Sequence, residues 1–173
     1  MQADLNKQLT ELIPRLRRFA IGLSGSRDKG DELVQRACER LLAHHERLRP
    51  DTSLGSWMYR VIRNLHIDTV RAQSVRERGA QQIRQSAELG LVTGNSMDSI
   101  LRLHEVHEAM QQLSEEHRSA LLLICVEGLS YKEAAETLQV PMGTVTSRLV
   151  RARKALLALM REDPGSQDLE ASR

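Results

Sequence analysis

The side chains with the clearest binding chemistry lie near the C-terminus, in a stretch that is rich in arginine and free of acids. No Asp or Glu occurs between Glu136 and Glu162. Four arginines and one lysine fall in the same span: Arg148, Arg151, Arg153, Lys154 and Arg161. Positive charge concentrated in this way attracts the phosphates of nucleic acids, although the whole chain has a formal net charge of only +2.

This stretch also has the periodicity of an amphipathic helix. Apolar residues recur at intervals of three and four: Val145, Leu149, Ala152, Leu156 and Leu159. Projected at about 100° per residue, the opposite face carries small and basic side chains: Gly143, Thr146, Ser147, Val150, Arg151 and Lys154, flanked by Arg148 and Arg153. Such a helix suits the major groove of DNA. Gly143 and Thr144 allow close approach, while Arg151 can reach guanine and Val150 a thymine methyl group.

A shorter helix is predicted just before this one. Ser130 and Glu133 have the spacing of a capping box, in which each side chain binds the backbone N–H of the other residue. Ala134 and Ala135 are small enough to let a second helix cross closely. Residues 139–141 form the turn, since Pro141 suits the first turn of a new helix. The sequence therefore predicts a helix-turn-helix over residues 129–157.

The histidines and cysteines give no comparable site. His44 and His45 are adjacent, and His104 and His107 share a helix face, but neither pair has a third metal ligand nearby. The two cysteines lie in aliphatic helical stripes and are interpreted as small hydrophobic residues of a protein in the reducing cytoplasm. No nucleophile, base and oxyanion site assemble, so we expect no enzyme, no metal and no cofactor.

The remaining helices are read from apolar periodicity. We predict helices over residues 5–23, from 28 or 31 to 48, 54–71 and 97–113, and a further one that starts after Ser114 and is stopped by Gly128. No strand pattern competes, so the predicted fold class is all-α. No segment near twenty apolar residues is present, and membrane insertion is not expected.

These motifs resemble the sigma-70 family of RNA polymerase sigma factors, in its extracytoplasmic-function (ECF) group. Residues 129–135, 141–148 and 151–153 are similar to the family's region 4, and residues 16–20, 31–35 and 56–68 are similar to its region 2. The resemblance implies two small helical domains: region 2 over 1–78, a linker over 79–96, region 4 over 97–161, and a tail over 162–173 that we expect to be disordered.

The resemblance also implies partners and roles. Region 2 would bind the coiled coil of the polymerase β′ subunit through Asp31, Glu32 and Gln35. It would meet the minus-ten promoter element with Arg60, Arg63, Asn64, Asp68 and Arg71, and capture a flipped base with the loop 49–56. Region 4 would bind the β flap and read the minus-35 element with Gly143, Thr144, Thr146, Ser147, Arg148, Val150, Arg151 and Lys154. An anti-sigma factor is the further expected partner.

Two departures from the family pattern affect the helix-turn-helix. Thr146 stands where Lys or Arg is usual, and Gln139 stands where a turn glycine is common, which strains the backbone if that position needs a positive φ. Two other functions remain open at this point. The chain could be a sigma-like decoy that sequesters an anti-sigma factor, or a conventional helix-turn-helix regulator, which leaves the first half without a role.

Overall fold

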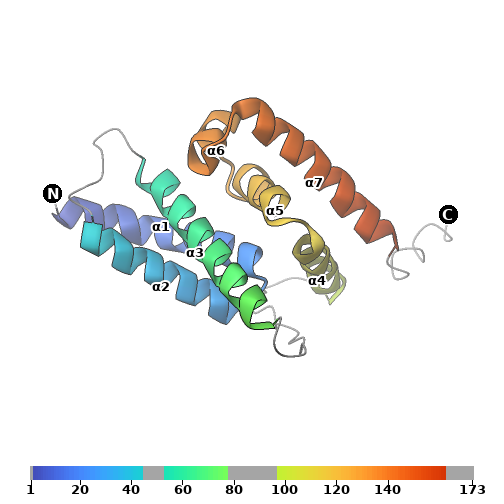
Figure 1. Cartoon of the computed structure of the whole chain (residues 1–173), viewed down its shortest axis with the longest axis horizontal. Helices are drawn as coiled ribbons and strands as arrows, with labels where there is room; N and C mark the ends of the chain where they lie inside the picture. Colours follow the sequence, from blue (N-terminus) through green and yellow to red (C-terminus); the bar gives the residue numbers. More distant parts are fainter. Residues whose placement is uncertain (1, 45–52, 78–96, 163–173) are drawn as a thin grey trace.

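The computed structural model describes residues 2–44, 53–77 and 97–162, and all regular structure within these ranges is helical. The N-terminal half consists of α1 (Gln2–Ser24), α2 (Arg27–His44) and α3 (Leu54–Glu77). The C-terminal half consists of α4 (Met97–Gln112), α5 (Glu115–Leu121), the π-helical segment η2 (Leu122–Val126), α6 (Tyr131–Leu138) and α7 (Met142–Glu162). The predicted all-α fold of two small helical domains is confirmed (Figure 1).

The N-terminal half forms because the three helices bury their aliphatic stripes against one another. Leu16 and Phe19 of α1, Leu41 of α2 and Ile62 of α3 are completely buried. The approach of α2 to α1 is unusually close at Gly30. A Cβ atom at this position would lie 2.9 Å from the backbone nitrogen of Ile21, so no residue with a side chain fits without moving a helix.

In the C-terminal half, α7 packs against α4, α5 and α6. The apolar stripe predicted for α7 is largely confirmed, because Val145, Leu149 and Ala152 are buried and Leu156 and Leu159 are half-buried. The helix that the sequence predicted after Ser114 is also present, and the Ser114 hydroxyl accepts a hydrogen bond from the His117 backbone N–H at 3.4 Å. None of the helices in the described ranges is long and apolar enough to cross a lipid bilayer.

The turn before α7 has the geometry that the sequence predicts. The Ser130 hydroxyl accepts from the Glu133 backbone N–H at 3.2 Å, and the Glu133 carboxylate accepts from the Ser130 backbone N–H at 2.8 Å, which completes the capping box. These hydrogen bonds hold the pKa of Glu133 below its usual value. Gln139 has φ +55° and is the only non-glycine residue with a positive φ in the described part of the chain.

Some predicted helix ends differ from the observed ones, and some predicted segments lie outside the described residues. Residues 45–48, predicted to end the second helix, lie outside the described residues, as do the predicted linker, residues 79–96, and residues 163–173 of the tail. The third helix runs to Glu77 instead of 71. Residues 72–77 carry little apolar periodicity, and they continue the helix because they contain no proline or glycine that would interrupt it.

The two halves lie side by side, an arrangement that the sequence did not predict (Figure 1). α1 contacts η2, α4 and α5, and α3 contacts α6. At Gly22 of α1 a Cβ atom would lie 2.6 Å from Cδ2 of Leu122, so the backbone of one half touches a core side chain of the other. α7 extends along the outer edge of the molecule, away from α2 (Figure 1).

We predict that replacing Gln139 by glycine stabilises the protein. The left-handed conformation costs a residue with a side chain roughly 1–2 kcal/mol, and the greater freedom of glycine in the unfolded chain offsets part of the gain. The free energy of unfolding in urea should therefore rise by up to about 1 kcal/mol. Glu136→Gly is the matched control, since glycine in an exposed helix interior should lower the same quantity by about 1 kcal/mol. A loss of stability in Gln139→Gly would contradict the strain.

Candidate nucleic-acid interface

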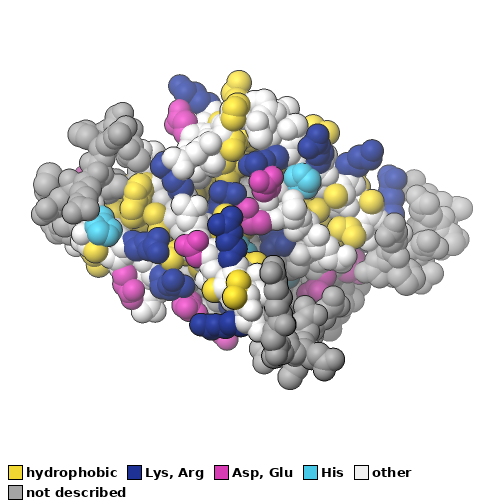
Figure 2. All heavy atoms as spheres, viewed as in Figure 1, with side chains coloured by type: hydrophobic (Ala, Val, Ile, Leu, Met, Phe, Trp, Pro, Cys, Tyr) yellow, Lys and Arg dark blue, Asp and Glu magenta, His cyan; other side chains and the backbone are white. Residues whose placement is uncertain are grey.

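The face of α7 that the sequence assigned to DNA is open to solvent. Most of its predicted contact residues are exposed: Gly143, Thr146, Ser147, Val150, Arg151 and Lys154. Thr144 is half-buried at the start of the helix. In Figure 2, Lys and Arg side chains are spaced along the side of the molecule where Figure 1 places α7. The helix therefore presents hydrogen-bond donors and small side chains on one side while its apolar side is fixed in the core.

Arg148 lies differently from its neighbours on α7. Its side chain is only 15% exposed, and a guanidinium nitrogen lies 3.0 Å from a carboxylate oxygen of Glu116 at the start of α5. This ion pair ties α7 to α5. In the structure Arg148 thus supports the position of the helix, and contact of this residue with DNA requires that the pair with Glu116 be broken.

The residues predicted to meet the minus-ten element all lie on α3, but only some of them are free. Asn64, Asp68 and Arg71 are exposed. Arg63 donates two hydrogen bonds to the Glu115 carboxylate of the C-terminal half, at 2.7 and 2.8 Å. Nε of Arg60 is buried and has no hydrogen-bond partner among the described residues.

The three residues predicted to bind the polymerase lie in the first half of α2. The Asp31 carboxylate accepts two hydrogen bonds from the Arg17 guanidinium of α1, at 2.7 and 2.8 Å. This pairing raises the pKa of Arg17. Glu32 and Gln35 are exposed next to it. The three side chains are close together and accessible at one surface of α2.

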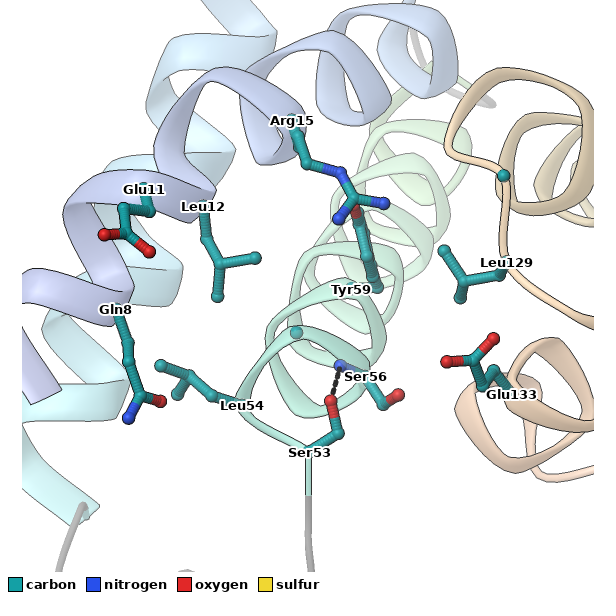
Figure 3. A pocket seen from close by; sticks show the side chains of 12 residues that line it. Gln8, Glu11, Leu12, Arg15, Ser53, Leu54, Ser56, Tyr59, Leu129 and Glu133 are labelled. Atoms are coloured by element: carbon teal, nitrogen blue, oxygen red, sulfur yellow. Dashed lines mark hydrogen bonds between the residues drawn. The ribbon is translucent and has the colours of Figure 1, made fainter.

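A groove of about 550 Å³ lies where the two halves meet, at the N-terminus of α3 (Figure 3). One wall is formed by Leu12 and Arg15 of α1, the floor by Ser53–Ser56 and Tyr59, and the other wall by Leu129 and Glu133 next to α6. Residues 49–52 of the predicted base-capturing loop lie outside the described residues. The described end of that loop, Ser53–Ser56, therefore faces the C-terminal half across this groove.

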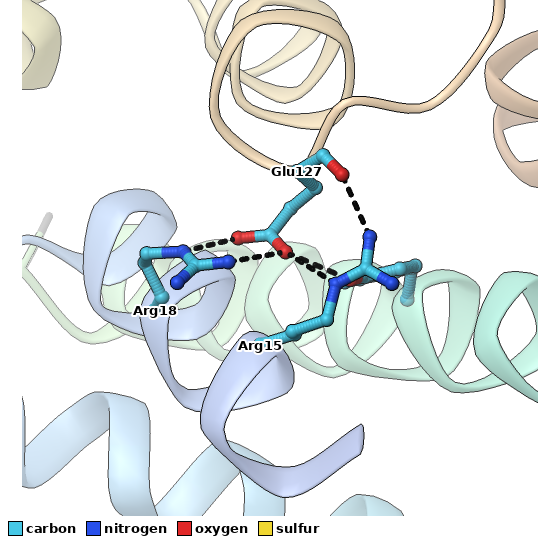
Figure 4. Close-up of polar contacts among 4 residues, drawn as sticks. Arg15, Arg18 and Glu127 are labelled. Atoms are coloured by element: carbon cyan, nitrogen blue, oxygen red, sulfur yellow. Dashed lines mark hydrogen bonds and ion pairs between the residues drawn. The ribbon is translucent and has the colours of Figure 1, made fainter. Parts of the chain in front are cut away.

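A fully buried carboxylate joins the two halves (Figure 4). The Glu127 side chain, at the end of η2, is 0% exposed. Arg18 Nε and Nη2 donate to its two oxygens at 2.9 and 3.1 Å, Arg15 Nε donates at 3.3 Å, and the Tyr59 hydroxyl donates at 3.0 Å. Arg15 Nη2 also donates to the Glu127 carbonyl oxygen at 2.6 Å. Burial and the nearby carboxylate raise the pKa of Tyr59, which keeps its hydroxyl protonated as a donor.

A buried guanidinium fixes the ends of two helices nearby. Arg118 of α5 donates to the carbonyl oxygens of Met110, Gln111 and Leu113 at the end of α4, at 2.7–2.9 Å. It also donates to the Leu23 carbonyl oxygen at the end of α1, at 2.7 Å. Helix C-termini carry unpaired carbonyl groups and partial negative charge, so a cation there is favourable. One side chain therefore holds α1, α4 and α5 together.

Two segments of the chain match known protein families. Residues 103–156 match the family described as Sigma-70, region 4, and residues 9–63 match the family described as the Sigma2 domain of PhyR. The chain is 34% identical over 165 residues to the ECF RNA polymerase sigma factor EcfG of Rhodopseudomonas palustris, which covers 95% of this chain and 89% of that protein. The chain belongs to the ECF RNA polymerase sigma factors.

Solved structures of similar fold include both sigma factors and a sigma-like regulator. The sigma factor RpoE of Bartonella quintana, solved in complex with the anti-sigma factor NepR, superposes with a TM-score of 0.81 and 29% identity, covering 92% of this chain and 98% of that chain. The anti-anti-sigma factor PhyR of the same organism, complexed with NepR, gives a TM-score of 0.58 at 22% identity, covering 88% of this chain and 49% of that one. The second likeness concerns the fold alone.

The residues that join the halves of this sigma factor were not predicted from its sequence. Arg15, Arg18, Glu115, Arg118 and Glu127 were not predicted to have a role. One signal was present, because Glu127 is an acid at the C-terminal end of an apolar helix, where the helix dipole disfavours negative charge. Such a residue needs cationic partners, but the sequence does not identify partners that are more than a hundred positions away.

Tyr59 of α3 is not available as a platform for stacking a base in the arrangement observed. The side chain is only 2% exposed, its ring packs edge-on against Phe19 at 5.0 Å between centroids, and its hydroxyl is held by Glu127. Trp57 is partly buried and packs against the hydrophobic core.

We predict that acid destabilises this sigma factor through His66 of α3. Burial, and secondarily the charge of Arg118, lower the pKa of His66 from 6.5 to about 4. Because the folded protein holds this imidazole neutral, its contribution to stability is present above about pH 6.5 and is lost as the pH falls toward 4. The midpoint of thermal unfolding should fall over this range, and it should fall less in His66→Gln. Equal falls in the two proteins would show that His66 carries none of the effect.

Proposed function

We propose that this ECF sigma factor binds core RNA polymerase and directs it to promoters, reading the minus-35 element with α7. The exposed, acid-free face of α7 in a helix-turn-helix is the observation that carries this proposal. The family membership of the chain supports the same function. No step of this function requires catalysis by the chain itself, and we propose that it acts in the cytoplasm, where bacterial RNA polymerase works.

The residues on the exposed face of α7 suit the two kinds of contact that a DNA-reading helix makes. Arg151 can donate two hydrogen bonds to the O6 and N7 atoms of guanine, and Lys154 can bind a phosphate as a point charge. Val150 is 60% exposed, so its methyl groups are free to contact a thymine methyl group. Thr146 supplies only a hydroxyl where relatives usually have Lys or Arg, so its contact should be weaker.

The N-terminal half is proposed to carry the other contacts. The polar face of α3, with Asn64, Asp68 and Arg71 exposed and Arg60 and Arg63 beside them, would meet the minus-ten element. Asp31, Glu32 and Gln35 would bind the β′ coiled coil of the polymerase, and the C-terminal half would bind the β flap. The surface of α2 supports this assignment, because its acidic and amide side chains suit a basic partner surface.

An anti-sigma factor is the further proposed partner. RpoE of Bartonella quintana was solved in complex with such a protein, and its likeness to this chain extends over both halves in one superposition. A TM-score of 0.81 over 92% of the chain indicates that the halves have a similar relative arrangement in the two proteins. A partner that recognises this arrangement would contact both halves at once.

The decoy function is the alternative with a specific observation in its favour. Residues 9–63 match the Sigma2 domain of PhyR, and PhyR itself was solved with an anti-sigma factor. A decoy, however, has no need for a DNA-reading helix, and the exposed basic face of α7 would then serve nothing. The similarity to EcfG also spans 95% of the chain, whereas the match to the PhyR family covers the N-terminal half only.

Run-off transcription tests the proposed function directly. Purified core polymerase with this chain should give a discrete transcript from a promoter of the chain's own organism, and core polymerase alone should give none. The template would carry DNA selected by the reconstituted enzyme from genomic fragments. If the chain yields no transcript but still binds an anti-sigma factor, the decoy function holds instead.

Substitution of one arginine separates sequence reading from general attraction to DNA. Arg151→Ala should weaken promoter binding by the holoenzyme by roughly 5- to 150-fold, since an arginine at a base edge is worth about 1–3 kcal/mol. Arg102→Ala is the charge-matched control, because Arg102 is exposed on α4, away from the reading face. Affinity would be measured by fluorescence anisotropy at fixed salt. Equal losses in both variants would contradict base reading by Arg151.

A further inference from the structure

The helix α7 is held in place by apolar contacts and by an ion pair at the edge of its apolar stripe. Val145, Leu149 and Ala152 are buried and fix how closely α7 packs on the core. Apolar contacts have no preferred direction, so they resist rolling of the helix about its own axis only weakly. The Arg148 guanidinium lies 3.0 Å from the Glu116 carboxylate of α5, and a contact of this geometry is directional. The pair therefore opposes rolling of α7.

Rolling matters because the side chains that read DNA lie close to Arg148 on the same helix. Arg151 follows Arg148 by three residues, which places the two side chains about 60° apart around the axis. A roll of roughly 20° would move side-chain atoms that lie about 6 Å from the axis by about 2 Å. Hydrogen bonds vary in length by only about 0.5 Å, so such a shift breaks the two bonds by which an arginine reads guanine. Reading by Arg151 thus depends on how α7 is rotated.

The Glu116 end of the pair is firmly held. Glu116 lies in the first turn of α5, where the partial positive charge of the helix N-terminus favours an acid. Ser114 caps the same turn, because its hydroxyl accepts from the His117 backbone N–H at 3.4 Å. Two residues after Glu116, the Arg118 guanidinium binds carbonyl oxygens at the end of α4. Glu116 is therefore a fixed anchor for the Arg148 side chain.

Burial separates Arg148 from the other cations of α7. Its side chain is 15% exposed, and its guanidinium already has a carboxylate partner. Arg151, Arg153 and Lys154 are exposed and can bind DNA phosphates without giving up an ion pair to an acid. A phosphate that bound Arg148 would leave the Glu116 carboxylate without its partner. Of these four basic residues, Arg148 is the least suited to contact DNA.

We propose that Glu116 is a positioning residue for reading the minus-35 element. Through Arg148 it fixes the rotation of α7, and Arg148 stays paired with Glu116 when the holoenzyme binds DNA. This inference rests on the proposed function, because the rotation of α7 matters only if this helix reads bases. Glu116 itself touches neither a base nor a phosphate. It increases the difference in affinity between correct and incorrect sequences and leaves the general attraction to DNA unchanged.

The salt dependence of DNA binding tests whether Arg148 contacts a phosphate. Fluorescence anisotropy would give the affinity of the holoenzyme, at several salt concentrations, for a labelled fragment selected by the reconstituted enzyme. Arg148→Met keeps a side chain of similar length and removes its charge. It should leave the slope of log affinity against log salt unchanged. Lys154→Met is the matched control, since losing one phosphate contact reduces the slope by about 0.9.

The discrimination between two DNA fragments tests the positioning role. The second fragment differs from the first only in a scrambled minus-35 segment, and any unfolded fraction of the protein cancels from the ratio of the two affinities. Glu116→Gln and Arg148→Met should each lower this ratio by up to about fivefold, the factor that an ion pair near a protein surface can contribute. The double variant should lower it no further, because both substitutions remove the same pair. Glu136→Gln, which removes an exposed acid of α6, should leave the ratio unchanged.

The outcomes separate a failure of the positioning role from a failure of the proposed function. An unchanged salt slope in Arg148→Met, together with lower and non-additive ratios, supports the positioning role. A slope reduced as much as in Lys154→Met overturns it, and so does a ratio that both single variants leave unchanged. In these two cases the unaltered holoenzyme still discriminates, so the proposed function stands. If the unaltered holoenzyme binds both fragments equally, the proposed function fails and the positioning role fails with it.

Discussion

The arrangement of the whole molecule depends on the burial of one carboxylate. A charged oxygen cannot leave water without hydrogen-bond donors, because the uncompensated charge costs several kcal/mol. Glu127 is fully buried and obtains its donors from Arg15, Arg18 and Tyr59 on the other half. Its position is set in turn by the π-helical turn of η2, in which the Glu127 N–H donates to the Leu122 carbonyl oxygen at 2.9 Å, and by Gly128 with φ +69°. The geometry at the end of η2 therefore places the Glu127 carboxylate, and the donors that this carboxylate needs fix how the two halves lie relative to each other.

The elements of this fold could be predicted because their signals are local. The apolar stripe of α7, the capping box of Ser130 and the stop at Gly128 each occupy a few neighbouring residues, and the structure contains all three. The solvent-exposed face of α7 followed from the same periodicity. The contacts of Glu127 with Arg15 and Arg18, and of Arg118 with Leu23, could not be predicted, because they join residues 95–112 positions apart and depend on how finished helices pack. Helix periodicity says which face is buried, and it does not say which distant arginine will meet which acid.

Several residues consequently have two roles that the sequence could not separate. Arg63 is a proposed contact for promoter DNA, yet in the packed molecule it binds Glu115. Arg148 was predicted to meet DNA, yet it pairs with Glu116 and supports α7. Tyr59, an aromatic side chain of the kind that can stack on a base, is a buried donor to Glu127. In each case a polar side chain suited to nucleic acid is satisfied by a partner within the chain.

The central claim is that the buried Glu127 carboxylate holds the two halves of the chain together. The most direct test is the distance between spin labels on α2 and α7, measured by pulsed electron resonance in the free chain and in its Glu127→Ala variant. The account predicts one short distance for the unaltered chain and a longer, broader distribution of distances for the variant. The same short distance in both proteins, with their helical content unchanged, would contradict it.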